Sequence, residues 1–163
     1  MELDEQERKF VEIIDEHGWH VMKVFGTETE PPFAYTTGLW KSFGHPELII
    51  VGLPTDKVQP ILNGMGLDIR DGVRRFEAGG PVPGVLEEGF DVYFADFDWA
   101  KVKEYFGWAL WYYGSYLGQW QQFPILQCVW PAKGNGSFPW SPEWPEDLKN
   151  RQPILGVRPP TAH

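Results

Sequence analysis

One short stretch of the sequence combines hydroxyl side chains with a glycine: Tyr35, Thr36, Thr37 and Gly38 follow one another. At the end of a strand, backbone amides and threonine hydroxyls can hold a phosphate group or a carbonyl oxygen. Threonine is also common within strands, so strand propensity followed by a glycine turn explains the same pattern. The stretch is therefore a candidate ligand site with a purely structural alternative.

Two of the four histidines, His20 and His45, lie within segments that we predict to be ordered. His45 precedes Glu47 by two residues at the entrance of a predicted strand, where an imidazole can serve as a general acid or base. At both positions the alternative is a histidine that is hydrogen-bonded or faces solvent. Because no His and Cys residues are clustered, the sequence predicts no metal site.

Aromatic residues are abundant, with eleven phenylalanines, nine tryptophans and six tyrosines. Part of this surplus is expected at a pocket or a partner-binding face, since large rings provide much contact area at little cost in rotamer freedom. An aromatic core is the alternative. We place Trp130 and Trp140 as walls of a candidate ligand pocket, whose other members are Tyr35, Thr36, Thr37, His45 and Glu47.

The motifs that identify common enzyme classes are absent, including the G-x-S-x-G nucleophile elbow, the P-loop, H-E-x-x-H and G-x-G-x-x-G. The single cysteine, Cys128, lies among apolar residues without an adjacent base, which favours a buried and unreactive thiol. The sequence assigns no catalytic residue and favours a non-enzymatic protein.

Fourteen basic and 23 acidic residues give a formal net charge of -9 at pH 7. Nucleic-acid binding needs a basic face, and the adjacent basic residues are only Arg8-Lys9 and Arg74-Arg75. We therefore predict no nucleic-acid partner. An acidic surface suits a basic protein partner, although acidity also serves solubility alone.

Localisation is indicated by three features of the sequence. A lone cysteine cannot form an internal disulfide, which fits a reducing cytoplasm. The first ten residues are polar and acidic, unlike a secretion signal. The longest apolar runs, 46–54 and 107–113, are too short to cross a bilayer. We expect a cytoplasmic protein without a membrane partner.

Hydrophobic periodicity predicts one helix and three strands in the first third of the chain, over 3–17, 19–25, 31–39 and 46–53. The apolar run Leu48 to Val51 indicates that the third strand is covered on both faces and lies centrally. A helix should follow, with Asp56 and Gln59 as a capping box and Pro60 in its first turn or at a kink.

The second half of the chain is predicted from glycine, proline and aromatic patterns. Residues 68–89 suit one or two strands joined by a glycine-rich loop, and 90–97 suits another strand. A long helix capped by Asp98 is expected over 99–113, and 123–131 is a buried strand candidate. The proline-rich tail, 139–163, should be irregular.

Together these elements predict one α+β domain over 1–163. Its sheet should be mostly antiparallel, with a barrel-like form as one option, and flanked by two or three helices.

Eight segments follow one another in a recognisable order: GWHVMKVFG, PPFAYTTGL, GHPELIIVGLP, LNGMG, FDVYF, FPILQCVWP, GSFPW and QPILG. In this order they resemble the DUF4262 domain, a bacterial family of unknown function, over about residues 18–156. The resemblance implies a small bacterial cytoplasmic protein. It transfers no reaction, cofactor or catalytic residue.

The YTTGL strand and the ELIIVG strand are also similar to flavin-binding split-barrel proteins, where a strand, a hydroxyl-bearing turn and a second strand build the flavin phosphate site. The basic residues that would bind the phosphate are missing here, since only Lys41 lies close to Tyr35–Gly38 in sequence. Flavin is the alternative cofactor, and otherwise none is predicted.

Two main functional hypotheses follow. The first is a non-enzymatic binding or interaction protein, immunity-like or regulatory, that offers an acidic and aromatic surface to a basic protein. The alternative is a small-ligand-binding or enzymatic domain built on the candidate pocket, with flavin as one ligand. A structural role within a larger assembly is a third hypothesis. No oligomeric state is predicted.

Overall fold

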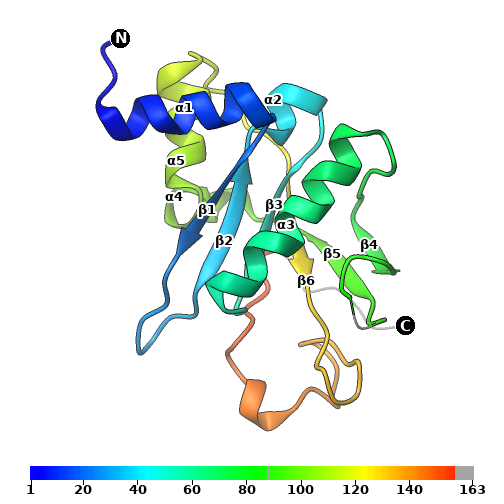
Figure 1. Ribbon diagram of the computed structural model, residues 1–163. Coiled ribbons are helices and arrows are strands. Elements are labelled where there is room, and N and C mark those ends of the chain that lie inside the picture. Colours follow the sequence, from blue (N-terminus) through cyan, green and yellow to red (C-terminus); the bar gives the residue numbers. More distant parts are fainter. Residues whose placement is uncertain (88, 157–163) are drawn as a thin grey trace.

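The extended segments predicted from β-branched and aromatic residues form one sheet in the computed structural model, which describes residues 1–87 and 89–156. Five α-helices are present within these described residues. The predicted α+β class is confirmed, and the described chain forms a single domain (Figure 1). The strands are β1 (His20–Val24), β2 (Phe33–Thr37), β3 (Glu47–Val51), β4 (Gly79–Val82), β5 (Val92–Asp96) and β6 (Ile125–Val129). The α-helices are α1 (Glu5–His17), α2 (Leu39–Phe43), α3 (Thr55–Arg70), α4 (Val102–Tyr105) and α5 (Gly107–Leu110).

The strand order in the sheet is β1-β2-β3-β6-β5-β4. The first three strands form the predicted antiparallel meander, β6 runs parallel to β3, and the remaining pairs are antiparallel. The sheet is mostly antiparallel, as predicted. It is open, with β1 and β4 as its edges, so the barrel-like form is not adopted.

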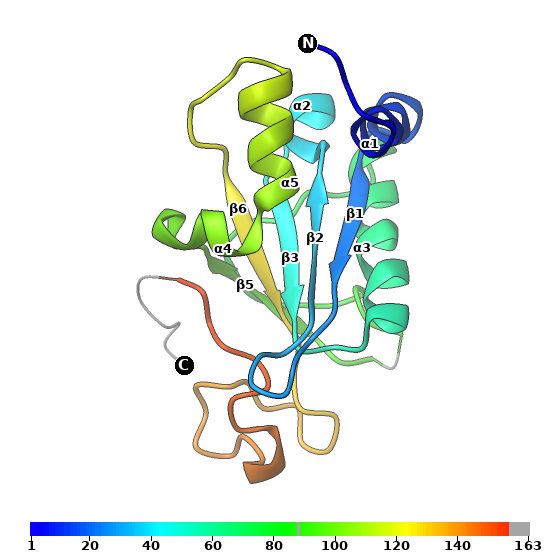
Figure 2. The same cartoon turned by 90° about the vertical axis from the view of Figure 1, so that its left-hand side faces the viewer.

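The two faces of the sheet are covered by different elements (Figure 2). On one face α3 packs Val58, Leu62 and Met65 against the sheet. On the other face lie α1 and the aromatic segment from α4 to Tyr116. The central position predicted for β3 is correct, since all five of its residues are buried.

The first helix matches its prediction closely, because its end signals are local. Asp4 and Glu7 form a reciprocal capping box at the N-terminus of α1. At the other end Gly18 has a φ of 99°, a left-handed conformation that glycine adopts without strain. Phe10, Val11 and Ile14 form the buried stripe that attaches α1 to the sheet.

The helix after β3 differs from its prediction at both ends. The capping box of Asp56 and Gln59 is wrong, because α3 already begins at Thr55 after Pro54 and shows no side-chain cap. Pro60 lies within the helix. The helix continues through Gly66, where a Cβ atom would come within 2.5 Å of the Trp19 ring. Gly66 therefore permits close packing against β1 instead of ending α3.

The predicted long helix over 99–113 is broken into shorter pieces. A 3-10 turn at Trp99–Lys101 precedes α4, and Phe106 separates α4 from α5 with φ -121° and ψ 39°. A π-helical segment, η2 (Trp111–Tyr116), then extends α5. The side chain of Asp98 caps the first turn, as predicted. The burial of Phe106 between Tyr35 and Phe123 is coupled to this break.

Two segments are not recognised as elements by sequence periodicity. The short helix α2 lies between β2 and β3, where the sequence predicted only a connection. The described tail is irregular as predicted, apart from a 3-10 turn at Glu146–Leu148. Two buried glutamines fix it: Gln127 bonds Pro153 and Leu155, and Gln152 bonds the backbone of Trp130. Residues 157–163 of the predicted tail lie outside the described residues.

Candidate functional site

Glu47, the first residue of β3, is an acidic residue with no exposed surface. Three consecutive backbone amides at the start of α2 donate hydrogen bonds to its carboxylate: Gly38 at 3.0 Å, Leu39 at 3.2 Å and Trp40 at 3.2 Å. These amides are available because the first turn of a helix leaves its N–H groups without intrahelical partners. Glu47 thus caps α2 from a neighbouring strand.

The turn between β2 and α2 depends on Gly38. Its φ is 116°, and a Cβ atom there would lie 2.6 Å from the carbonyl oxygen of Gly18. A side chain is excluded both by this left-handed conformation and by the close approach of the α1–β1 connection. The glycine of the YTTG stretch therefore aims the amides of α2 at Glu47.

Two hydroxyl groups complete the shell around the carboxylate. Thr36 donates from Oγ1 at 2.8 Å, and the Tyr113 hydroxyl donates to Oε2. Each hydroxyl also accepts a backbone amide, from Leu48 and Lys41 respectively, so its own proton is directed to Glu47. We call Glu47, Thr36, Tyr113 and the amides of 38–40 the Glu47 centre.

The five groups that bond Glu47 among the described residues are all placed as donors, an arrangement that favours an ionised carboxylate. Burial raises the pKa of Glu47, while hydrogen bonds from Tyr113, Thr36 and the backbone oppose that rise. Burial and the nearby Glu47 charge raise the pKa of Tyr113, which therefore remains a protonated donor. The ion pairs found among the described residues do not include Glu47.

The Tyr35–Gly38 stretch was predicted as a candidate site for a phosphate group or a carbonyl oxygen. Its hydrogen-bond donors instead bind a carboxylate of the same chain, that of Glu47. Thr36, Gly38 and Glu47 are brought together as one centre. Tyr113 could not be found from the sequence, because it lies 66 residues from Glu47 and no local pattern links the two. Thr37 is also buried, but its hydroxyl has no hydrogen-bond partner in the structure.

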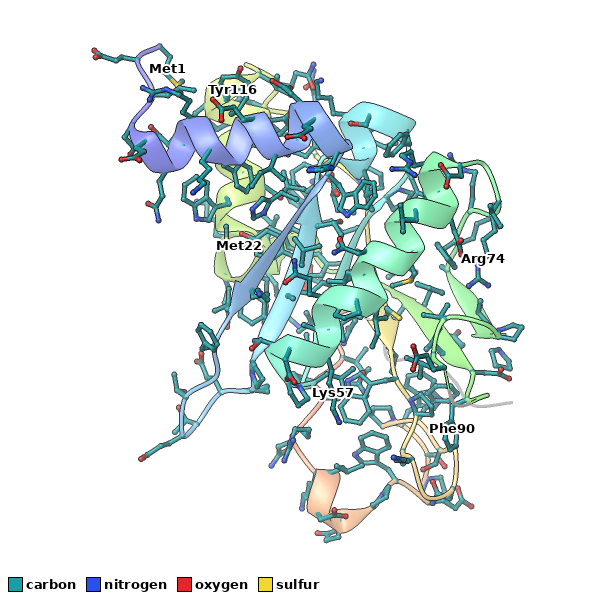
Figure 3. The ribbon with its side chains drawn as sticks, viewed as in Figure 1. Met1, Met22, Lys57, Arg74, Phe90 and Tyr116 are labelled. Carbon is teal, nitrogen blue, oxygen red and sulfur yellow. The ribbon has the colours of Figure 1, made fainter. Side chains whose placement is uncertain are left out.

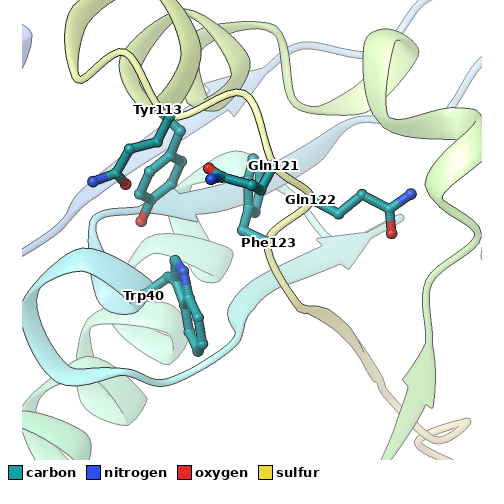
Figure 4. Close-up of a pocket in the computed structure, with 6 residues that line it drawn as sticks. Trp40, Tyr113, Gln121, Gln122 and Phe123 are labelled. Atoms are coloured by element: carbon teal, nitrogen blue, oxygen red, sulfur yellow. The ribbon is translucent and has the colours of Figure 1, made fainter.

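A small cavity of about 30 Å³, shown in Figure 4, lies next to the Glu47 centre. It is lined by Tyr113 of that centre and by Trp40 of α2. The remaining lining residues precede β6: Gln119, Gln121, Gln122 and Phe123. A volume of this size holds about one water molecule, which is far less than a flavin or another cofactor needs.

The segment that lines this cavity also presents exposed aromatic rings. Trp120 is 74% exposed, yet its ring lies directly on Gly114, where a Cβ atom would come within 2.3 Å of the ring. Tyr116 stacks on Trp111 and on Tyr112 with centroids 5.7 Å away in both cases. These rings are both accessible and held in place.

An acidic helix packs against the segment that carries Tyr116, since Phe10 of α1 contacts the rings of Trp111 and Tyr112. The first 17 residues carry seven acidic and two basic side chains. Glu12, Asp15 and Glu16 of α1 are exposed, and the charge of Asp15 contributes to raising the pKa of Tyr112, the ring on which Tyr116 stacks. In Figure 3 Tyr116 appears beside α1, at the same end of the molecule as α2. We call Trp40, Tyr116, Trp120, Glu12, Asp15 and Glu16 the aromatic–acidic end.

His45 is buried and fully hydrogen-bonded. Its Nδ1 bonds the Pro46 carbonyl at 2.8 Å, and its Nε2 accepts the Phe76 amide at 2.9 Å. This pattern fixes a neutral imidazole that donates from Nδ1. Burial lowers the pKa of His45, and the charge of Arg75 acts in the same direction. The structure therefore favours the hydrogen-bonded histidine over a solvent-accessible acid or base.

The remaining members of the candidate pocket do not converge on the Glu47 centre. Tyr35 is buried and accepts the Trp108 amide at 3.0 Å, and burial raises its pKa to about 12. Trp130 is buried against Trp144 and donates to the Val51 carbonyl at 2.8 Å. Trp140 stacks on Phe138 in the described tail. Of the seven candidate pocket residues, Thr36 and Glu47 therefore belong to the Glu47 centre, and the other five are not part of it.

Three other features bear on chemistry and location: the thiol of Cys128, groups that could hold a metal ion, and helices that could cross a membrane. Cys128 is buried, and burial raises the pKa of its thiol to about 12, so the thiol is unreactive. Over residues 1–87 and 89–156, no group of three or more His, Cys, Asp or Glu side chains is placed to hold a metal ion. Within the same ranges, every helix is too short or too polar to cross a membrane.

The fold and the site together define a structural class of protein: an open α+β sheet whose central strand begins with a buried carboxylate that caps a neighbouring helix. The model of the DUF4262 family, described as a domain of unknown function, matches residues 13–145. The chain belongs to this family, which confirms the resemblance seen in the sequence. No curated protein and no solved structure matches the chain.

Proposed function

We propose that this protein is a non-enzymatic interaction protein of the bacterial cytoplasm, which binds a basic protein through its aromatic–acidic end. The observation that carries the proposal is the pairing of exposed, positionally fixed rings with exposed carboxylates on adjacent elements. Protein-binding hot spots combine large aromatic anchors with surrounding polar groups in this way.

The fixed position of Trp120 supports a binding role. An exposed tryptophan that moves freely loses conformational entropy when a partner immobilises it. The contact with Gly114 removes much of this loss beforehand, since the ring is already packed along one side. Trp40, 40% exposed, lines a cavity with Gln119 and Gln121, the two residues that flank Trp120 in sequence. Trp40 therefore lies next to the segment that carries the preorganised Trp120.

The charge of α1 supports a basic partner. Glu12, Asp15 and Glu16 extend the surface with negative charge, and the net charge of the whole chain is -9. Opposite charge on a partner would accelerate association and would make it sensitive to salt. A partner segment rich in lysine or arginine could also place cations over the exposed tryptophan rings.

The alternative of a flavin-binding or enzymatic domain receives less support. Among the phosphate donors expected in Tyr35–Gly38, the Gly38 amide and the Thr36 hydroxyl already bind Glu47. The adjoining cavity of about 30 Å³ is too small for an isoalloxazine ring. The interaction hypothesis therefore accounts for more of the observed geometry.

Site-specific photo-crosslinking tests the proposal. A photoreactive residue is placed at the exposed position 119, next to Trp120, or, as a control, at position 25, where Phe25 is 77% exposed but lies beyond β1. In bacterial cytoplasm we expect position 119 to capture a protein with a basic surface. Capture should fall in Trp40→Ala and in higher salt, and it should persist in Phe25→Ala. Equal capture at both positions, or capture unaffected by Trp40→Ala, would refute the proposed surface.

A further inference from the structure

Three buried polar side-chain atoms lack a hydrogen-bond partner in the described part of the chain, and they belong to one region. They are Nδ1 of His20, Oγ1 of Thr37 and the hydroxyl of Tyr112. Buried polar groups without any partner are rare, because each one loses its hydrogen bonds to water on folding. Their occurrence in a single region therefore calls for a shared explanation.

His20 and Thr37 face each other across two strands. They are paired in the antiparallel register of β1 and β2, so their side chains point to the same face of the sheet. This is the face covered by α1, since the ring of His20 lies 4.8 Å from the ring of Phe10. The two unpartnered atoms are thus neighbours beneath α1.

Tyr112 lies against the same ring of α1. The centroid of its ring is 6.1 Å from that of Phe10, and Phe10 also lies against His20. Tyr112 has no exposed surface, and Thr37 has none either. The shared contact with Phe10 therefore places Tyr112 in the same buried region as the His20–Thr37 pair.

The chemistry of the three groups defines their ligand. A threonine hydroxyl and a tyrosine hydroxyl can each donate and accept, and a neutral imidazole nitrogen accepts. Buried water molecules typically make about three hydrogen bonds to groups of this kind. No charged side chain is among the three, so an ion would not be compensated there.

We propose that one buried water molecule binds beneath α1 and bridges His20 Nδ1, Thr37 Oγ1 and the Tyr112 hydroxyl. The water donates to His20, accepts from Tyr112 and shares its remaining proton or lone pair with Thr37. It therefore links β1, β2 and η2 under the helix that carries the acidic part of the aromatic–acidic end. Burial and the charge of Lys23 lower the pKa of His20, which keeps the imidazole neutral and its Nδ1 able to accept.

The sequence supplies matched controls one residue away. Thr36 and Tyr113 have the same side chains as Thr37 and Tyr112, but their partners are protein groups of the Glu47 centre. Variants Thr37→Val and Tyr112→Phe should remove the bridged water. Variants Thr36→Val and Tyr113→Phe should leave it in place.

Water-selective NMR on the full chain is the direct test. We expect a nuclear Overhauser effect from a long-lived water to the Thr37 methyl group and to the Tyr112 ring. The Tyr112 signal should disappear in Thr37→Val, and the Thr37 signal should disappear in Tyr112→Phe. Both signals should remain in a folded Tyr113→Phe control. Absence of the effect in the unmodified protein would overturn the proposal.

Thermal unfolding provides a second test of the bridging water. If water bridges the groups, Thr37→Val and Tyr112→Phe should each lower Tm by about 2–4 °C, the shift expected for one net hydrogen bond in a chain of this size. The double variant should lower Tm by less than the two single shifts combined. If the hydroxyls have no partner at all, either change should leave Tm unaltered or raise it, and the proposal fails.

Discussion

Two buried polar sites lie side by side in this protein, and they are built from the same residue types. The Glu47 centre uses Thr36 and Tyr113, and the site beneath α1 uses Thr37 and Tyr112. In the first, every hydroxyl proton has a carboxylate acceptor. In the second, residues 1–87 and 89–156 provide no protein partner.

The difference arises from a shift of one residue in each segment. Successive residues of a strand point to opposite faces, and successive residues of a helical segment such as η2 point in different directions. Thr36 and Thr37 therefore cannot serve the same site, and neither can Tyr112 and Tyr113. The comparison shows that residue type alone does not decide whether a buried hydroxyl is satisfied.

Glu47→Gln should give the largest effect, because it changes the acceptor at the middle of five donors. The amide nitrogen of glutamine would meet hydroxyl or backbone donors, and the negative charge that they solvate would be lost. We expect a loss of about 3–5 kcal/mol in the free energy of unfolding, measured by urea denaturation. A loss below about 1 kcal/mol would mean that the Glu47 centre is no stronger than the site beneath α1.

Tyr113→Phe should have the next largest effect. It removes one donor from Glu47 and leaves the Lys41 amide without its acceptor. The expected loss is about 1–3 kcal/mol. Tyr112→Phe is the matched comparison and should cost less, because its hydroxyl bonds neutral groups only, whereas the Tyr113 hydroxyl donates to a carboxylate. If the two variants are equally destabilised, the proposed contrast between the sites is wrong.

His45 gives the protein a dependence on pH that is separate from both sites. Its pKa is lowered in the folded state by burial, so below the ordinary value of 6.5 the unfolded chain binds a proton more readily. The stability contributed by neutral His45 is complete above about pH 6.5 and decreases as the pH falls. Unfolding free energies at pH 7.5 and 5.5 should show this decrease.

The control for this prediction is His45→Gln, whose stability should depend less on pH over the same interval. The pKa of His20 is lowered as well, so His20→Gln should remove the part of the pH dependence that His20 contributes. An unchanged pH dependence in His45→Gln would show that burial does not keep the imidazole of His45 neutral in the folded protein.

Trp120→Ala should have the smallest effect on stability, within about 0.5 kcal/mol, because most of the ring is already exposed. Its effect on partner capture should be large in comparison. Trp19→Ala is the contrasting variant, since Trp19 is buried and its indole donates to Asn63 at 3.0 Å. A strong loss of stability in Trp120→Ala would indicate that this ring serves the fold rather than binding.

Much of the fold follows from local patterns. The capping box of Asp4 and Glu7 and the left-handed Gly18 define α1 without reference to the rest of the chain. The apolar run of β3 correctly predicted a strand that is buried on both faces. Where prediction failed, the cause was tertiary: α3 continues through Gly66 because Trp19 packs there, and the long helix breaks at the buried Phe106.

The candidate site was only partly accessible to sequence reasoning. Thr36 and Gly38 were identified because hydroxyls and a glycine follow one another near a strand end, and Glu47 because it follows His45 by two residues at the entrance of a strand. That their anion is internal could not be foreseen, since Glu47 must be brought opposite the amides of 38–40 by the pairing of β2 with β3. Trp40 and Trp120 were indistinguishable from the other seven tryptophans until the structure showed which are exposed.

The sequence by itself determined the class of fold, the acidity, the surplus of aromatic residues and the membership of the family. Composition, periodicity and the order of segments can all be read from the chain without its tertiary contacts. Tertiary structure alone decided which polar groups meet. The partners of Glu47 come from positions 36 to 113, and strand pairing and helix packing set their distances to within a hydrogen bond. Such convergence depends on contacts between distant residues, which no local pattern encodes.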